Sequence, residues 1–301
     1  MKYIRKASLI IMLIMMLYIT LEHIDNLDRN LFENGVYKEL NENIKVCEKK
    51  LLLSKGLNNC FEKTFDLEVI SRNNYCKTIA HRGYSNIAPE NTIPAYKMAG
   101  KYGFYGAETD VYETKDGYYI LMHDETVDRT TTGSGLISQL TLEEIKELTI
   151  DFGANVSKYP GLRVPTLEEF FIVCKEYGMV PVIEIKNISN PIVFIDLIKK
   201  YGLEDKCIVI SFNRKLLENI RNINKNINIQ AIIDITIDNI NYCKKNNFDI
   251  DTSYKVVTKE LVSYAHSKDV KVNVWTIDDI EMRSKLIQYG VDFITTDLFT
   301  N

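Results

Sequence analysis

The stretch around which this chain is organised is Glu108–Asp124, ETDVYETKDGYYILMHD, which reads as a β-hairpin with polar side chains on both arms. Its turn falls at Asp116-Gly117. A two-residue Asp-Gly loop suits a type I′ turn, which would pair Lys115 with Tyr118. The sequence therefore predicts two antiparallel strands joined by a tight turn at this point.

The predicted hairpin brings acidic side chains and a histidine together. Counting back from the turn places Asp110 directly across from His123. Side chains alternate along a strand, so Glu108 and Asp110 point to one face and His123 lies beside them. Two like charges on one face are unfavourable unless a positive charge lies between them, which indicates a bound cation. The simpler interpretation is a surface hairpin with solvated acids.

Around the hairpin, short apolar segments alternate with helical ones, as in βαβ units. The eight predicted strands are Lys77–His81, Tyr105–Val111, Val180–Ile185, Cys207–Ser211, Asn228–Ile233, Phe248–Thr252, Val270–Trp275 and Asp292–Thr296. Eight parallel strands with intervening helices favour an α/β TIM barrel over an open doubly wound sheet, which stays possible. No Gly-x-Gly-x-x-Gly follows the first strand, which speaks against a dinucleotide-binding fold.

Several helix starts are marked by capping residues. Asn91 is predicted to cap the helix that runs to Tyr102. Thr141 with Glu144, and Thr166 with Glu169, fit the capping box. The first of these boxes opens a short helix at Leu142–Leu148, inside a predicted insertion at about residues 125–164. We expect this insertion to cover part of a site at the carboxyl ends of the strands.

Composition indicates an ordinary globular protein. The chain has 301 residues, of which 46% are hydrophobic and 26% charged, with a net charge of −4. It carries no long run of Lys or Arg, so we do not expect nucleic acid as a partner.

The first 21 residues have the pattern of an export signal. Lys2, Arg5 and Lys6 precede the uncharged run Ala7–Leu21, which is shorter than the roughly 20 residues of a membrane-spanning helix. No Ala-x-Ala-like cleavage site follows, so we favour an uncleaved signal-anchor over a cleaved signal peptide. Either interpretation predicts an extracytoplasmic protein, membrane-anchored or secreted. Residues 22–76 read as a partly helical spacer, and 77–301 as the barrel domain.

The six cysteines show no metal-binding spacing. Cys174 and Cys207 lie in apolar runs and are expected to be core thiols. In an exported protein, two of Cys47, Cys60 and Cys76 could form a disulfide, and the sequence does not say which.

Chemistry in a TIM barrel gathers where the strands end. The polar and aromatic residues near those ends are His81, Arg82, Glu108, Asp110, Glu184, Lys186 and Trp275. Glu184 lies within an apolar strand, where a carboxylate is costly unless it is paired or bound to a metal. A plain Glu184–Lys186 ion pair is the alternative.

Together these residues indicate phosphodiester cleavage. Carboxylate oxygens favour Ca²⁺ or Mg²⁺, which engage phosphate oxygens. Arg82 offers a planar fork for phosphate and Lys186 a point charge. His81 and His123 can act as general base and general acid. Trp275 fits either core packing or a substrate site.

His266 lies within a predicted helix and is expected to be structural or solvated.

An ordered set of motifs resembles the glycerophosphodiester phosphodiesterase family. The motifs are Ile79-Ala80-His81-Arg82-Gly83, Pro89-Glu90-Asn91-Thr92, Glu108-Thr109-Asp110, Lys115-Asp116-Gly117, His123-Asp124, Asp128-Arg129-Thr130-Thr131, Pro165-Thr166-Leu167-Glu168-Glu169, Glu184-Ile185-Lys186 and Asn273-Val274-Trp275-Thr276. The resemblance spans Lys77 to about Thr296 and does not cover the residues before it.

This resemblance implies a TIM barrel with a small inserted subdomain after the hairpin. It also implies hydrolysis of small-molecule glycerophosphodiesters to glycerol 3-phosphate and an alcohol. By resemblance, His81 and His123 are the acid–base pair. Contacts to phosphate would come from Arg82 and Lys186, with Trp275 beside the glycerol. The divalent cation, Ca²⁺ or Mg²⁺, would be held by Glu108, Asp110 and Glu184.

Two other functions stay open. A catalytically idle headgroup-binding protein would not need both histidines together with three acids. A related barrel phosphodiesterase acting on intact phospholipids, of phospholipase C or D type, should carry an apolar rim on the insertion. The segment Ala154–Leu162 is only mildly apolar.

Overall fold

The computed structural model describes residues 76–299. The predicted signal or anchor at residues 1–21 and all but the last residue of the predicted spacer, 22–76, lie outside this range, as do Cys47 and Cys60. Within it, none of the helices has both the length and the apolar character needed to cross a membrane.

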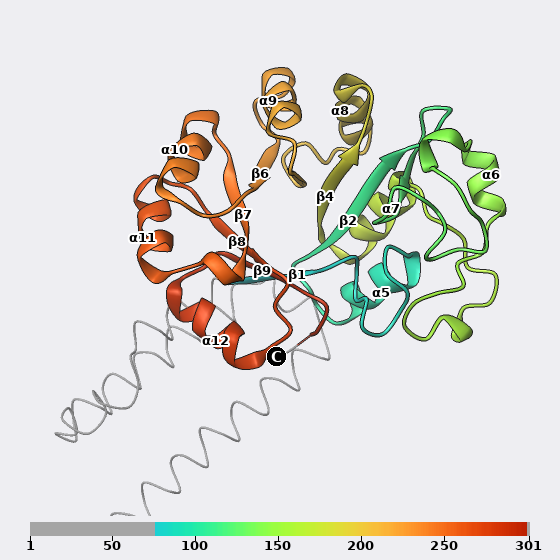
Figure 1. The fold of residues 1–301 in the computed structure, drawn as a ribbon, viewed down its shortest axis with the longest axis horizontal. Coiled ribbons are helices and arrows are strands. Elements are labelled where there is room, and N and C mark those ends of the chain that lie inside the picture. The colour runs from blue at the N-terminus through green and yellow to red at the C-terminus, as the bar shows by residue number, and fades with distance from the viewer. Residues whose placement is uncertain (1–75, 300–301) are drawn as a thin grey trace, which may run out of the picture. The chain divides into compact units, whose positions relative to one another are not determined.

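Eight parallel strands close into a barrel, as predicted (Figure 1). Each strand pairs with the next in the order β1, β2, β4, β5, β6, β7, β8 and β9, and β9 returns to β1. The strands are β1 Lys77–Ala80, β2 Gly106–Glu113, β4 Val180–Asn187, β5 Ile208–Ser211, β6 Asn228–Ile232, β7 Asp249–Ser253, β8 Val272–Trp275 and β9 Phe293–Thr296. The open-sheet alternative is therefore wrong, because β1 pairs with both β2 and β9 and so closes the ring of eight parallel strands.

Helices surround the barrel between successive strands (Figure 1). They are α5 Ile93–Lys101, α7 Leu167–Tyr177, α8 Pro191–Lys200, α9 Arg214–Ile223, α10 Ile237–Asn246, α11 Lys259–Ser267 and α12 Ile280–Tyr289. The capping box of Thr166 and Glu169 forms at the start of α7 as predicted.

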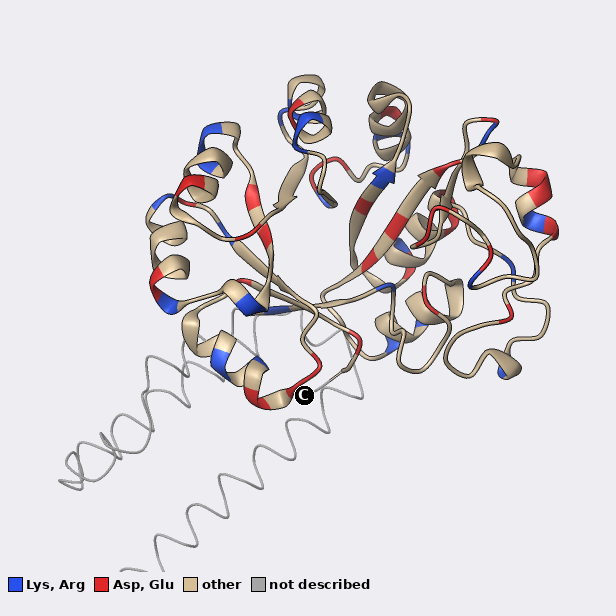
Figure 2. Ribbon diagram, viewed as in Figure 1, with Lys and Arg blue, Asp and Glu red and all other residues tan. Residues whose placement is uncertain are grey.

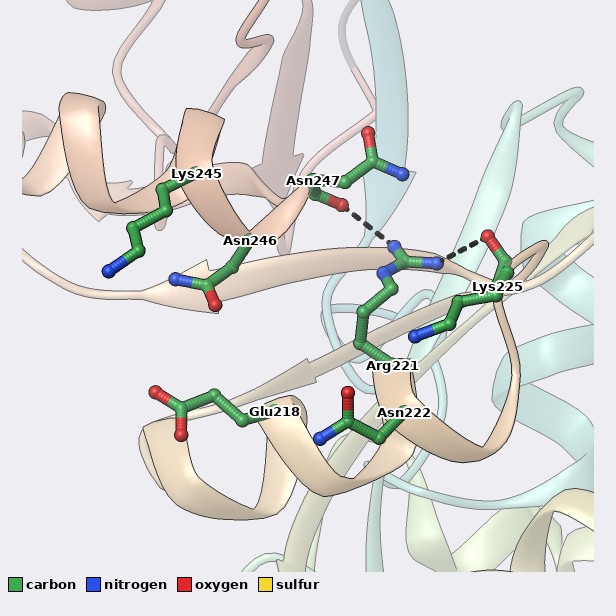
Figure 3. Close-up of a pocket in the computed structure, with 7 residues that line it drawn as sticks. All are labelled: Glu218, Arg221, Asn222, Lys225, Lys245, Asn246 and Asn247. Atoms are coloured by element: carbon green, nitrogen blue, oxygen red, sulfur yellow. Dashed lines mark hydrogen bonds between the residues drawn. The ribbon is translucent and has the colours of Figure 1, made fainter.

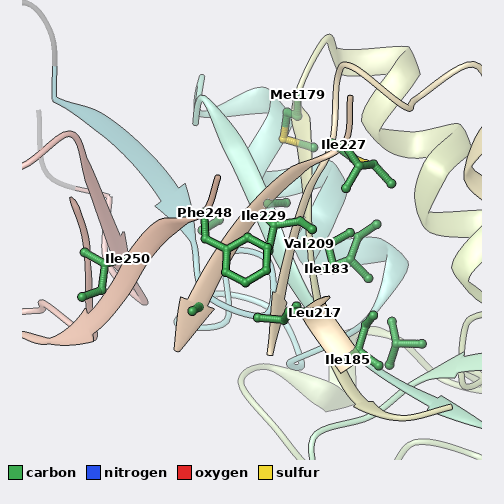
Figure 4. Packing of buried hydrophobic residues seen from close by; sticks show 14 of the residues in the cluster. Met179, Ile183, Ile185, Val209, Leu217, Ile227, Ile229, Phe248 and Ile250 are labelled. Carbon is green, nitrogen blue, oxygen red and sulfur yellow. The ribbon is translucent and has the colours of Figure 1, made fainter. Parts of the chain in front are cut away.

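Apolar side chains form two layers, one on each side of the barrel wall. Inside the barrel, Ile79, Val182, Ile210 and Phe293 belong to one buried cluster. Outside it, strand residues pack against the helices in a larger cluster that also holds Cys174 and Cys207, as expected (Figure 4). Buried apolar side chains on both faces explain why the strands read as continuous apolar runs.

The predicted register of the hairpin is wrong by one residue. β3 Tyr119–Leu121 pairs with β2 so that Val111 lies across from Leu121. The backbone N–H of Met122 donates to the carbonyl of Asp110 at 3.0 Å, so Met122 takes the place across from Asp110 that was predicted for His123.

The cause of this shift is a three-residue loop, Lys115–Gly117, in place of a two-residue turn. A type I′ turn needs positive φ at both central residues, and only Gly117, at 85°, has it. The Asp116 carboxylate instead accepts hydrogen bonds from the Thr114 hydroxyl at 2.7 Å and the Leu142 N–H at 2.9 Å. The second hydrogen bond joins the loop to the insertion. Rules that predict turns from neighbouring residues cannot foresee this contact.

The insertion has a small core of its own. Buried residues from the hairpin and the insertion, including Ile120, Val127, Ile145 and Val164, form a separate cluster. Its short helix α6 Leu142–Glu147 begins with the predicted capping box. Two 3₁₀ turns, η2 Ile137–Gln139 and η3 Val156–Lys158, complete it.

Two isoleucines on helix α8 provide a test of how the helices pack against the outside of the barrel. Ile198 is fully buried, whereas Ile192 on the same helix α8 is 55% exposed. We expect Ile198→Ala to lower the free energy of unfolding by about 2–5 kcal/mol, because it leaves a cavity. The matched control Ile192→Ala should change it by less than about 0.5 kcal/mol. Urea unfolding measures both, and equal losses would contradict this packing.

Candidate active site

Three carboxylates converge at the carboxyl ends of β2 and β4. Asp110 and Glu184 are register partners on these strands, and Glu108 lies two residues earlier on β2 (Figure 2). One oxygen from each of the three lies within 4.8 Å of the others. Glu108 and Asp110 are buried, and one oxygen of Glu108, Oε1, is buried with no hydrogen-bond partner in the described part of the chain. Hard oxygen atoms at this spacing fit a divalent cation.

Two cationic side chains lie against these acids. The Lys186 Nζ atom is 3.0 Å from Asp110 Oδ1 and 2.5 Å from Glu184 Oε1. The Arg82 Nε atom is 3.4 Å from Asp110 Oδ2, and the Arg82 backbone N–H donates to Glu108 at 2.8 Å. The Glu184–Lys186 ion pair is therefore present, but as one part of a larger charged cluster.

The pKa values of the three acids shift in different directions, because burial, repulsion between the acids and the nearby cations act on each of them to a different extent. Burial, with Asp110 nearby, raises the pKa of Glu108 to about 8 and also raises that of Glu184. Burial would raise the pKa of Asp110 too, but Lys186 and Arg82 outweigh it and the pKa is lowered. A bound divalent cation would favour the ionised form of all three.

A carboxylate holds each of the two predicted catalytic histidines. Nδ1 of His81 lies 2.8 Å from Oδ1 of Asp297, and Nδ1 of His123 lies 2.8 Å from Oδ1 of Asp124. Burial lowers the pKa of His81, but the hydrogen bond to Asp297 and the charge of Glu108 together outweigh it and the pKa is raised. His123 is near enough to Asp110 and Glu184 for its charge to lower the pKa of both carboxyls, despite the shifted register.

Asn91 belongs to this site rather than to a helix cap. It has a left-handed backbone, with φ of 54°, and Thr92 caps α5 instead. Its side-chain amide donates to Asp110 Oδ2 at 2.8 Å, and its carbonyl accepts from the Asp110 N–H at 3.2 Å and the Tyr96 hydroxyl at 3.1 Å. The predicted role was wrong because Asn serves both caps and left-handed turns, and the sequence alone does not separate them.

Aromatic rings lie at the ends of β5 and β8. Trp275 ends β8, and among the described residues its buried Nε1 has no hydrogen-bond partner. Phe212 follows β5, is 62% exposed, and has its ring centroid 6.4 Å from that of Trp275. Trp275 is therefore only partly in the core, and Phe212, which the sequence analysis did not name, lies near it at the carboxyl ends of the strands. His266 pairs with Asp292 at 2.9 Å, away from the acid cluster.

Comparison with known proteins agrees with this geometry. Residues 81–299 match the profile of the Glycerophosphoryl diester phosphodiesterase family. The chain belongs to this family of enzymes. It is 37% identical over 228 residues to the glycerophosphodiester phosphodiesterase of Caldanaerobacter subterraneus subsp. tengcongensis, covering 73% of this chain and 93% of that one. It is 30% identical over 250 residues to the Bacillus subtilis enzyme, covering 74% and 83%.

Solved structures show the same fold. A phosphodiesterase from Oleispira antarctica, in complex with the product sn-glycerol-3-phosphate, is 27% identical with a TM-score of 0.69. The match covers 76% of this chain and 95% of that one. Members of this family are phosphodiesterases, so the alternative of a catalytically idle headgroup-binding protein is not favoured.

The carboxylate beside His81 gives a direct test of the site. Because the hydrogen bond to Asp297 is the largest effect that raises the pKa of His81, we expect Asp297→Asn to lower that pKa, measured by following the His81 ring signal in an NMR pH titration. The matched control is Asp292→Asn beside His266, which should leave His81 unchanged. An unchanged His81 pKa in Asp297→Asn would contradict the assigned pairing.

Proposed function

We propose that the protein hydrolyses glycerophosphodiesters to sn-glycerol 3-phosphate and an alcohol. The observation that carries this proposal is the pair of carboxylate-held histidines beside three clustered acids. The names of the curated relatives support the substrate class. The product bound to the Oleispira antarctica enzyme supports the reaction that this family performs.

One divalent cation, Ca²⁺ or Mg²⁺, would be held by Glu108, Asp110 and Glu184. When bound, it would neutralise charge on the phosphoryl oxygens. The proposal is supported by the clustered oxygen atoms and by the orphaned oxygen of Glu108. Lys186 and Arg82 remain beside the cluster as donors to the substrate phosphate.

Arg82 is well suited to hold a phosphate oxygen in one position. Its guanidinium donates to Glu90 at 3.0 Å, and Glu90 in turn accepts from Arg129, which also contacts Asp124. This chain of ion pairs connects Arg82 to the carboxylate that holds His123. Phe212 and Trp275 would pack against the glycerol carbon atoms.

The proposed reaction has two steps, with the histidines exchanging roles. In the first, His81 removes the proton from the glycerol 2-hydroxyl, which attacks phosphorus, while His123 protonates the leaving alcohol. This step yields a cyclic phosphate. In the second, His123 removes a proton from water, which opens the ring, and His81 returns its proton to the 2-hydroxyl. Asp297 and Asp124 hold each ring by Nδ1 and leave Nε2 for these transfers.

Activity of the purified full chain tests the acid–base roles. It should release sn-glycerol 3-phosphate from a panel of glycerophosphodiesters, and the preferred member identifies the alcohol. His81→Asn or His123→Asn should each lower kcat by about 10²–10⁴-fold. The control His266→Asn should retain the wild-type rate. Full activity in either of the first two variants would remove that histidine from the mechanism.

A substrate with hydrogen in place of the 2-hydroxyl tests the internal nucleophile. The hydroxyl is already positioned beside phosphorus, and such proximity is worth several orders of magnitude in rate. We therefore expect this analogue to resist hydrolysis. Turnover at the normal rate would identify water as the direct nucleophile.

Chelation tests the metal site through stability as well as rate. EDTA treatment should abolish turnover, and adding Ca²⁺ or Mg²⁺ to chelated protein should raise Tm, because the ion binds only the folded state. Glu184→Gln keeps the side-chain volume but removes a ligand, so the Tm increase should be lost. The matched control Glu168→Gln should keep it. A chelated wild-type protein with full activity would exclude the metal role.

The location of the protein remains a proposal based on its first 21 residues. We propose that they tether the enzyme to the outer face of the membrane. Fractionation should find full-length protein in the membrane pellet. Soluble protein in the medium that starts near residue 22 would indicate a cleaved signal, and cytosolic protein would exclude export.

A further inference from the structure

A polar pocket lies at the amino ends of β6 and β7, the opposite end of the barrel from the acids. It is a cavity of about 410 Å³, lined by Glu218, Arg221, Asn222, Lys225, Lys245, Asn246 and Asn247 (Figure 3). Its volume falls within the range of small-ligand sites.

Arg221 is the central residue of this pocket. It is 91% buried, since its relative exposure is 9%, and within residues 76–299 it forms no ion pair, although Asp249 interacts with it electrostatically. Its two terminal nitrogens donate to the carbonyls of Lys225 and Asn247, each at 2.8 Å. Arginine carries five N–H donors, and among the residues that the structure describes Nε has no acceptor.

The remaining charges in the pocket are mostly positive. Lys225 and Lys245 are exposed, and neither forms an ion pair with any residue that the structure describes. The one acid of the lining, Glu218, is already engaged by the Tyr242 hydroxyl at 3.1 Å and by Lys215 at 3.4 Å. The pocket lining therefore has an excess of positive charge, which the nearby Asp249 offsets only in part.

We propose that this pocket binds the phosphate group of a small anionic ligand, separately from the active site. A planar guanidinium with free N–H donors suits tetrahedral oxyanions, and the two lysines add mobile ammonium groups. The same phosphate chemistry is offered by a free phosphorylated molecule or by an anionic lipid headgroup. This site does not depend on the proposed catalytic function, because none of its residues belongs to the acid cluster or the histidine pairs.

Arg221 also joins two loops, because it donates hydrogen bonds to the carbonyls of Lys225 and Asn247. Its replacement is therefore expected to destabilise the fold. The test therefore keeps Arg221 and uses the double variant Lys225→Ala, Lys245→Ala. The matched control is Lys199→Ala, Lys200→Ala on α8, which removes the same charge elsewhere. The probes are the NMR signals of the Arg221 Nε–H and the Asn247 amide in the full chain. Ionic strength is held constant with chloride, so that general screening does not vary.

Titration with inorganic phosphate should shift both signals along a saturating curve in the wild type and in the control. In the pocket variant, affinity should fall by about tenfold, the scale for two exposed charge contacts. Phosphodiesterase activity should be unchanged in both variants. If the protein bound phosphate in the pocket but showed no phosphodiesterase activity, the result would count against the proposed function and not against the pocket.

A second titration identifies the source of the phosphate. It uses dihexanoyl phosphatidylglycerol below its micelle concentration, with dihexanoyl phosphatidylcholine as the zwitterionic control. Tighter binding of phosphatidylglycerol than of inorganic phosphate assigns the pocket to a lipid headgroup, and the reverse order assigns it to a free phosphate. If neither anion shifts the two signals, or if the pocket variant binds as tightly as the control, the proposal is overturned.

Discussion

The active site depends on keeping three carboxylates together inside a barrel. Parallel pairing of β2 with β4 sets Asp110 beside Glu184, and strand alternation brings Glu108 to the same side. Burying like charges costs several kcal/mol for each ion unless they are compensated. The neighbouring contacts supply this compensation: Lys186 bridges two of the acids, and Arg82 and Asn91 adopt left-handed backbones beside them. Such strained conformations persist where the surroundings over-determine them.

Closure of the barrel is needed for the His81–Asp297 pair as well as for the fold. His81 follows β1 and Asp297 follows β9, 216 residues apart in sequence, and the β1–β9 ladder makes them neighbours. The His81 N–H donates to the Thr296 carbonyl at 2.9 Å, which fixes the backbone next to this pair. An open sheet with the same strands would leave His81 without its carboxylate.

The sequence predicted most of the features that depend on local periodicity. It failed to predict those that depend on contacts between segments far apart in the chain. All eight barrel strands were found because buried parallel strands form continuous apolar runs. Glu108 and Asp110 were predicted to share a face because side chains alternate along a strand, and Glu184 was singled out because a carboxylate in an apolar strand is costly unless it is compensated. The hairpin register was missed because Asp116 is held by Leu142 of the insertion. Asp297 and Phe212 were missed because each meets its partner only through the closed barrel.

The arginines at the two ends of the barrel, Arg82 and Arg221, differ in how far neighbouring carboxylates compensate their charge. Burial lowers the pKa of Arg82, but Asp110, Glu90 and Glu108 outweigh it and raise the pKa, so the protein itself already compensates this charge. Burial also lowers the pKa of Arg221, and there the nearby Asp249 offsets it only in part. A guanidinium with several carboxylates around it is held in position, which suits the proposed role of Arg82 toward a substrate phosphate. A guanidinium that is compensated only in part, such as that of Arg221, would be stabilised further by a bound anion, and this is the physical basis of the pocket proposed above.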